Sequence, residues 1–264
     1  MMNHSAINIS NYQNGIVRVT LNRPDIHNAF DDELIAQLTS TFLELDQDDS
    51  IRVLILDAAG KSFSAGADLN WMKKMSEYSL EDNLQDSQCL ADLMSSLHGM
   101  RCSTIASVQG AAYGGGVGLV ACCDIAVASM NASFCFSEVK LGLIPAVISP
   151  YVVQAIGARA AKRYFLTAER FGAKRAAALG LISEFVHETE LEASVMSLAE
   201  LIIENGPEAV TQAKQLIKDV EGQPIDAHLQ SMTAHRIATI RASSQGKEGV
   251  NAFLEKRKAN WGKK

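Results

Sequence analysis

The 264-residue sequence lacks any uninterrupted apolar run long enough to cross a membrane, since a spanning helix needs about 20 such residues. Its first residues lack the basic segment and apolar stretch that are typical of a secretory signal peptide. The five cysteines include no C-x-x-C pair, and an odd number without metal-ligand spacing indicates free thiols in a reducing compartment. We therefore expect a cytoplasmic protein that does not act at a membrane.

An excess of basic charge is also missing. Lysine and arginine total 24 against 30 aspartates and glutamates, which gives a formal net charge of −6. A protein that coats nucleic acid normally presents the opposite balance, because phosphate contacts need clustered cations. The charge balance therefore argues against nucleic acid as a partner.

Several common site motifs are incomplete. A Gly-Lys-Ser segment at 60–62 resembles part of a phosphate-binding P-loop, but the first glycine that motif requires would fall at Ile55. The glycines at 114–116 do not complete G-x-G-x-x-G, because position 119 is leucine. No serine lies in a G-x-S-x-G frame. The six histidines show no metal-ligand spacing, so no metal site is predicted.

The most informative segment present is the glycine triplet 114–116. It follows a strand-like segment at 103–109, leads into an apolar run, and is followed by a second strand-like segment at 124–128. This layout places bare backbone N–H groups at the start of a buried helix, where the helix dipole favours negative charge. A tight turn between strand and helix is the simpler alternative.

A second open loop favours the binding interpretation. Residues 61–69 follow the apolar strand 53–56, and the small residues at 64–67 again leave the backbone accessible. Two such loops predict a pair of N–H donors that converge on one oxyanion, as acyl-transfer and enolate chemistry requires.

An acidic residue, Glu138, follows the second strand in an apolar setting of phenylalanine, cysteine, valine, leucine and isoleucine. Such surroundings disfavour the charged carboxylate and raise its pKa toward the range that is useful for proton transfer. The alternative is an exposed glutamate at a strand end, paired with Lys140.

The strand-like segments recur along the chain with helical patterns between them, which favours an α/β fold with right-handed crossovers. A helix is expected from about 31 to 45. From about 191 onward the pattern predicts helices that are interrupted at 206–207 and 222–224. The expected strands are 15–21, 52–57, 103–109, 124–128 and 181–186.

Together the glycine triplet, the 63–69 loop and the 137–145 stretch resemble the enoyl-CoA hydratase/isomerase (crotonase) superfamily, and the likeness extends from residues 17–24 to residues 253–257. The resemblance implies a crotonase-like β-β-α spiral core over residues 1–195, which binds CoA and carries the active site. It implies a C-terminal helical trimerisation region over residues 196–264, and hence a homotrimer or a dimer of trimers.

The resemblance also implies an acyl-CoA thioester substrate, so that CoA arrives as part of the substrate and no separate cofactor is expected. The catalytic group is expected to comprise Glu138 as acid/base with the Ala67 and Gly115 amides as the oxyanion hole. Expected contacts to CoA are Ile26, Ala65, Ala67, Asp68, Leu69 and Gly115.

One departure from the family pattern leaves the reaction open. Typical hydratases of the family carry a glutamate two residues after the triplet, where this chain has Gly118. Hydration of a 2-enoyl-CoA by Glu138 alone and double-bond isomerisation by Glu138 alone both fit the residues. The segments 146–157 and 163–171 resemble the bacterial methylglutaconyl-CoA hydratase group of leucine catabolism, which favours hydration of 3-methylglutaconyl-CoA.

A non-enzyme that binds acyl-CoA or RNA is a further alternative. The basic C-terminal residues are compatible with it, although a solvated tail or contact with a CoA phosphate explains them as well. These residues are Lys256, Arg257, Lys258, Lys263 and Lys264.

Overall fold

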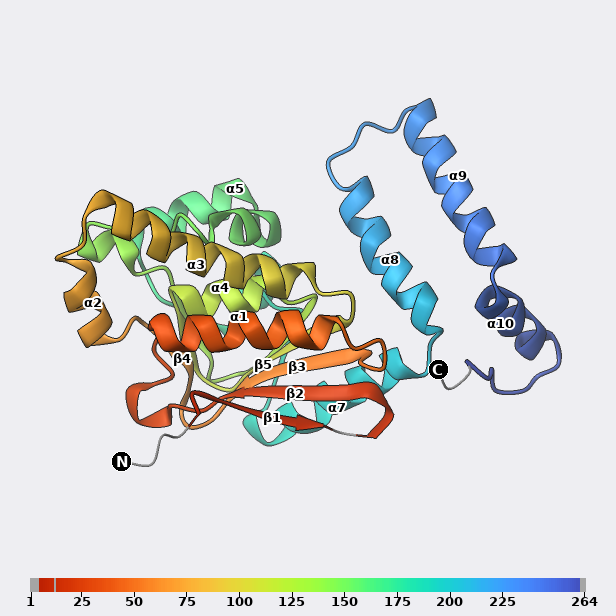
Figure 1. Ribbon diagram of the computed structural model, residues 1–264, viewed down its shortest axis with the longest axis horizontal. Coiled ribbons are helices and arrows are strands. Elements are labelled where there is room, and N and C mark those ends of the chain that lie inside the picture. The colour runs from red at the N-terminus through yellow and green to blue at the C-terminus, as the bar shows by residue number, and fades with distance from the viewer. Residues whose placement is uncertain (1–4, 12, 262–264) are drawn as a thin grey trace. The chain divides into compact units, whose positions relative to one another are not determined.

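The computed structural model describes residues 5–11 and 13–261, so Lys263 and Lys264 of the basic tail lie outside the described residues. The chain divides into two compact units, residues 1–199 and 200–264. The first unit contains two sheets and the helices around them, and the second contains helices (Figure 1).

The larger sheet has six strands in the order β1-β2-β3-β5-β7-β10. Only β1 runs antiparallel to its neighbour, and the other strands pair in parallel. Five of these strands were expected, and each observed strand lies within about three residues of its predicted bounds. The strands are β1 (Ile7–Asn11), β2 (Ile16–Leu21), β3 (Val53–Ala58), β5 (Ser103–Val108), β7 (Ile125–Ser129) and β10 (Glu184–Val186).

Both faces of this sheet are covered. Alternate residues of β2, such as Val17 and Val19, join the core that contains Leu38 of helix α1 (Asp32–Asp46) and Leu97 of helix α3 (Leu80–Gly99). Both helices lie on one side of the sheet (Figure 1). Successive side chains of a strand point to opposite faces, and Arg18 accordingly bonds Glu192, at the start of a helix on the other face.

The smaller sheet has four strands in the order β4-β6-β8-β9, of which the first three are parallel. These strands were not predicted, because two to four residues are too few to show a periodic pattern. They are β4 (Ser62–Ala65), β6 (Ala111–Tyr113), β8 (Ser133–Cys135) and β9 (Phe171–Gly172). The carboxyl ends of the three parallel strands open onto one edge, which positions the site described below.

Further helices and single turns connect the strands of the first unit. The α-helices are α2 (Leu69–Met75), α4 (Gly115–Cys122), α5 (Ser149–Thr167) and α6 (Ala173–Leu179). The 3-10 turns are η1 (Gln13–Gly15), η2 (Pro24–Ile26), η3 (Glu138–Leu141) and η4 (Glu188–Glu190). Helix α5 is broken at Gly157, where φ is 73°.

Helix α7 (Leu191–Ile203) runs from the first unit into the second. The break expected at 206–207 lies between α7 and α8 (Pro207–Val220), and the break expected at 222–224 lies between α8 and α9 (Ala227–Ala242). Helix α10 (Ser244–Leu254) follows. Neither α8 nor α9 contains a buried residue. Large apolar side chains are instead exposed in this unit: Leu201, Ile217, Ile225, Ile237, Val250, Phe253 and Leu254.

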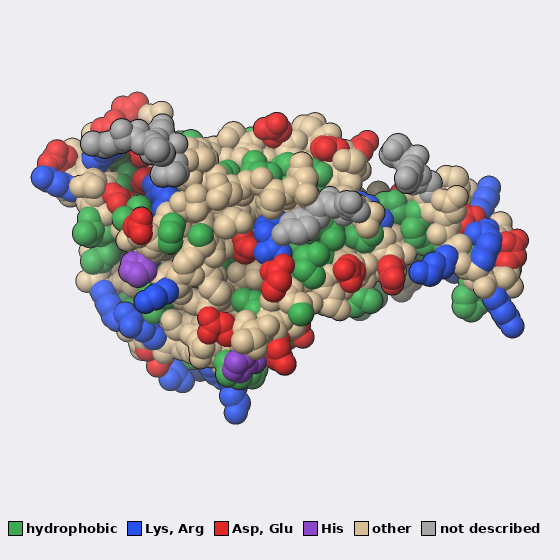
Figure 2. All heavy atoms as spheres, turned by 90° about the horizontal axis from the view of Figure 1, so that it is seen from below, with side chains coloured by type: hydrophobic (Ala, Val, Ile, Leu, Met, Phe, Trp, Pro, Cys, Tyr) green, Lys and Arg blue, Asp and Glu red, His purple; other side chains and the backbone are tan. Residues whose placement is uncertain are grey.

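Acidic and basic side chains are interspersed over the face shown in Figure 2. Among the described residues, no helix combines the length and apolar character needed to cross a membrane.

Candidate active site

Three loops that are far apart in sequence meet at one edge of the smaller sheet. Ala65 of β4 is paired with Tyr113 of β6, and Tyr113 is paired with Cys135 of β8. Because neighbouring strands lie about 4.8 Å apart, the residues that follow these three positions emerge side by side. Ala67 and Gly115 come two residues after their strand ends and Glu138 comes three, so the fold brings the predicted catalytic group together.

The first loop presents the amide of Ala67. Phe30 N–H donates to Gly66 O over 3.1 Å, and Asp68 N–H donates to Phe30 O over 2.8 Å. These two bonds hold the backbone on both sides of Ala67. Within the described part of the chain, the Ala67 N–H itself donates to no acceptor. It is therefore available to a ligand oxygen.

The second loop presents the amides at the start of α4. Gly114 has φ 55° and ψ −121°, a conformation that L residues rarely adopt, and its N–H bonds Cys135 O over 3.0 Å. A β-carbon at Gly116 would lie 2.4 Å from Ser64 O, so only glycine allows the two loops to approach this closely. Gly115 N–H begins the helix and, like the first amides of any helix, has no partner within it.

Glu138 faces the second loop. A β-carbon at Gly114 would lie 3.3 Å from Glu138 Oε1, which places the carboxylate against the glycines. Glu138 Oε2 is buried and has no hydrogen-bond partner among the described residues. Burial raises the pKa of Glu138. Lys140 is exposed and forms none of the ion pairs found in the described residues, so the expected alternative of a Glu138–Lys140 surface pair is not what the structure shows.

The space beside Gly118, where the first of the family's usual two glutamates is absent, is filled by an apolar side chain. A β-carbon at Gly118 would lie 2.3 Å from Ile148 Cγ2 and 3.0 Å from Met94 Cε. Side chains on a helix lean toward its N-terminus, so a side chain at 118 would extend toward the turn at Gly114 and Gly115. Ile148 is only 3% exposed and occupies that space. The sequence signalled the missing carboxylate but not the residue that replaces it.

The loops expected to contact CoA are joined to one another. Ala65 N–H donates to His27 O over 3.0 Å, and the Ser64 hydroxyl donates to Asn28 O over 2.8 Å. Ile26 is 41% exposed and Leu69 is 80% exposed, so both offer apolar surface to a ligand. Contact with CoA by these two residues stays a prediction, as it does for the other four: Ala65, Ala67, Asp68 and Gly115.

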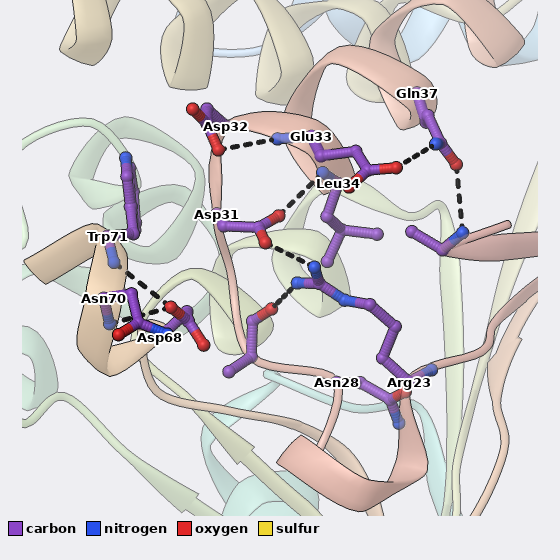
Figure 3. Close-up of polar contacts among 12 residues, drawn as sticks. Arg23, Asn28, Asp31, Asp32, Glu33, Leu34, Gln37, Asp68, Asn70 and Trp71 are labelled. Carbon is purple, nitrogen blue, oxygen red and sulfur yellow. Dashed lines mark hydrogen bonds and ion pairs between the residues drawn. The ribbon is translucent and has the colours of Figure 1, made fainter. Parts of the chain in front are cut away.

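Asp68, besides being an expected CoA contact, is the N-cap of α2. Its carboxylate accepts hydrogen bonds from Asn70 N–H at 2.8 Å and Trp71 N–H at 3.1 Å, and thereby caps the start of α2 (Figure 3).

Arg23, which sequence reasoning did not single out, organises the neighbouring loop. Its guanidinium donates to Ala29 O and forms an ion pair with Asp31 (Figure 3). The second oxygen of Asp31 caps α1 by accepting from Leu34 N–H over 2.8 Å. Arg23 thus fixes the residues on both sides of Phe30.

Three residues with donor or cationic side chains, Tyr151, Arg159 and Lys162, lie on α5, and none of them forms a hydrogen bond or ion pair with Glu138 among the described residues. Tyr151 packs against His98, with ring centroids 5.1 Å apart. Burial and, to a lesser degree, the charge of the Cys122 thiol raise the pKa of Tyr151. Cys122 ends α4, about 10 Å along the helix from Gly115, and Arg159 and Lys162 are exposed further along α5.

Comparison with known proteins identifies the family of the chain. A family model for enoyl-CoA hydratase/isomerase matches residues 11–264, nearly the whole chain. The chain belongs to the enoyl-CoA hydratase/isomerase family.

Similar proteins show the extent of the likeness. A Legionella pneumophila structure described as an enoyl-CoA hydratase/isomerase (crotonase) is 48% identical, has a TM-score of 0.94, and aligns over 98% of this chain and 99% of that one. An enoyl-CoA hydratase from Shewanella pealeana is 45% identical with a TM-score of 0.93, over 97% of this chain and 96% of that one. The 2,3-dehydroadipyl-CoA hydratase of Escherichia coli K12 is 32% identical over 93% of this chain and 94% of its own length. The predicted crotonase-type α/β fold is confirmed.

Proposed function

We propose that this enoyl-CoA hydratase/isomerase family member is a hydro-lyase that adds water across the double bond of a 2-enoyl-CoA, with Glu138 as its acid/base. The observation that carries the proposal is the buried, unpartnered oxygen of Glu138 beside the glycine loop. The free Ala67 amide and the start of α4 follow the ends of the neighbouring strands β4 and β6. The hydratase names of relatives support the same reaction.

The reaction then proceeds through an enolate. The thioester oxygen accepts hydrogen bonds from Ala67 N–H and Gly115 N–H, which stabilise the negative charge that develops on it. Glu138 takes a proton from water as the hydroxide adds to C3, and the electrons of the double bond move toward the thioester oxygen. Glu138 then gives that proton to C2, which restores the carboxylate and completes the 3-hydroxyacyl-CoA.

A single carboxylate serves in this scheme because Ile148 excludes a side chain at Gly118. One carboxylate also suffices for isomerisation, in which Glu138 would move a proton between C4 and C2 through a dienolate. Hydration is favoured here by the names of the similar proteins.

The substrate is proposed to be 3-methylglutaconyl-CoA, a branched 2-enoyl-CoA with a distal carboxylate. Support comes from the 146–157 segment and from the E. coli relative, whose named substrate also carries a distal carboxylate. A buried carboxylate needs a cation or donor. Lys140 and Arg170 are better placed for this than Tyr151, since their charges act on Cys135 at the end of β8. Arg170 also lies 5.1 Å from the ring centre of Tyr113.

The test compares substrates and variants. Purified protein is incubated with 3-methylglutaconyl-CoA, crotonyl-CoA and a 3-enoyl-CoA, and products are identified by mass spectrometry. Gain of one water on either 2-enoyl substrate is expected, with 3-methylglutaconyl-CoA preferred. Migration of the 3-enoyl double bond without water addition to any substrate would instead make the protein an isomerase. Arg170→Met should weaken the preference for 3-methylglutaconyl-CoA, whereas Arg159→Met, on α5, should leave it unchanged.

A further inference from the structure

Phe30 contacts both loops that present the candidate oxyanion donors. Its backbone brackets Ala67, since Phe30 N–H bonds Gly66 O and Phe30 O accepts from Asp68 N–H. Its side chain lies on the other loop, because a β-carbon at Gly115 would be 3.2 Å from ring atoms Cε2 and Cζ and 3.3 Å from Cδ2.

The position of Phe30 is itself strongly fixed. The residue is 3% exposed and belongs to the main hydrophobic core. Arg23 binds the backbone oxygen of Ala29 and the carboxylate of Asp31, the residues immediately before and after Phe30. Asp31 is in turn the N-cap of α1. Phe30 is therefore held from both sides by a cluster of charged groups that does not include Glu138.

We infer that Phe30 is a positioning residue that sets the separation between the Ala67 and Gly115 amides, so that both can reach one thioester oxygen. The inference rests on the proposed function, because it assumes that these two amides stabilise an enolate. Phe30 itself touches no reacting atom in this account. Its backbone fixes one donor, its ring limits how closely the other loop can approach, and displacement by about 1 Å can cost on the order of 100-fold in rate.

A double-mutant cycle tests the ring contact. Phe30→Leu removes the ring and lets the second loop relax, so kcat should fall about 10- to 100-fold while KM changes little. Gly115→Ala keeps the amide but places a methyl group against the ring, so it should also lower kcat. In the double variant the methyl group partly refills the space, so the combined loss should be smaller than the product of the two single losses.

A spectroscopic readout separates this inference from the reaction. Bound acetoacetyl-CoA ionises to an enolate to the extent that the oxyanion donors stabilise it, and the enolate is detected by its ultraviolet absorption. Phe30→Leu should lower the enolate fraction of the bound ligand. This holds whether or not the protein hydrates 2-enoyl-CoA, so failure of the proposed reaction alone would leave the enolate result standing.

The matched control is Phe42→Leu. Phe42 is a fully buried phenylalanine of α1 that contributes to the core. It should lower stability while leaving kcat and the enolate fraction near parental values. If Phe30→Leu does not fold, Phe30→Met takes its place with the same expectation. Parental kcat and enolate fraction in the folded Phe30 variant, or single losses that multiply in the double variant, would overturn the assignment.

Discussion

At the residue scale, the proposed chemistry depends on one carboxylate whose burial disfavours its charged form. Glu138 is partly buried, one of its oxygens has no partner among the described residues, and burial raises its pKa above the ordinary 4.5. A general base must be ionised to accept a proton from water. The rate constant kcat/KM should therefore rise with pH through the pKa of Glu138, at a higher pH than an unperturbed glutamate would give.

Glu138→Gln keeps the shape and removes the base, so kcat should fall about 100- to 10,000-fold. The measurement is kcat/KM against pH for the parental and variant proteins, in which the acidic limb should disappear with the activity. Glu44→Gln, at an exposed position of α1, is the control and should behave as the parent. A folded Glu138→Gln protein with parental activity would show that Glu138 is not the base.

A second prediction at this scale concerns the contact between Gly118 and Ile148. Because a β-carbon at 118 would lie 2.3 Å from Ile148 Cγ2, Gly118→Ala should destabilise the protein by about 1–3 kcal/mol through overpacking. Ile148→Ala should relieve that overlap, so the double variant should be more stable than the two single changes predict together. Urea denaturation gives the free energy of unfolding of the two single variants and the double variant. Additive losses would show that the two residues do not oppose each other.

The sequence indicated the candidate catalytic residues more clearly than the residues that support them. Glu138 and the two open loops were visible because an acid in apolar surroundings and runs of small residues are rare local patterns. Ile148 and Phe30 look like ordinary core residues in sequence. Their roles depend on which side chain they face after folding, and that information is not local.

At the element scale, the site depends on three short parallel strands and on the helices that begin beside them. Five strands of the larger sheet and helix α1 were predicted because apolar residues recur along them, whereas the bounds of the long helices α3 and α5 were not. Strands β4, β6 and β8 were not, since three or four residues cannot show a period. They form because neighbouring strands of the same chain supply their hydrogen bonds, and a single sequence does not state which strands become neighbours.

Helix α2 offers a test at this scale. Asp68 accepts hydrogen bonds from two of its first amides. Asp68→Ala should therefore lose about 1 kcal/mol of stability, whereas Asp68→Asn should retain most of the cap. Denaturation and steady-state kinetics are measured for both variants. Retained kcat in Asp68→Asn is expected, and its loss from a folded, stable Asn variant would instead make Asp68 the acid/base.

At the scale of the whole molecule, the C-terminal unit indicates assembly. Its helices α8 and α9 bury none of their own residues, and several large apolar side chains are exposed, including Ile217 at 66% and Phe253 at 81%. Exposed apolar surface of this kind is typical of protein interfaces.

We expect a homotrimer or a dimer of trimers, with closed symmetry as in most soluble oligomers. Light scattering over a wide concentration range should give three or six times the monomer mass of 28.5 kDa. Ile217→Glu should shift the mass downward if α8 contributes to the interface, whereas the exposed apolar residue Ile9 on β1 provides a control, Ile9→Glu. A monomer at every concentration would contradict the prediction.

The central claim is that Glu138 alone transfers protons while water adds to a 2-enoyl-CoA at this site. The most direct measurement follows hydration in isotopically labelled water for the parental protein and for Glu138→Gln. The account predicts that the parent forms 3-hydroxyacyl-CoA with labelled oxygen at C3, and that the folded variant forms it at least about 100-fold more slowly. Label incorporated at the parental rate by Glu138→Gln would contradict the account.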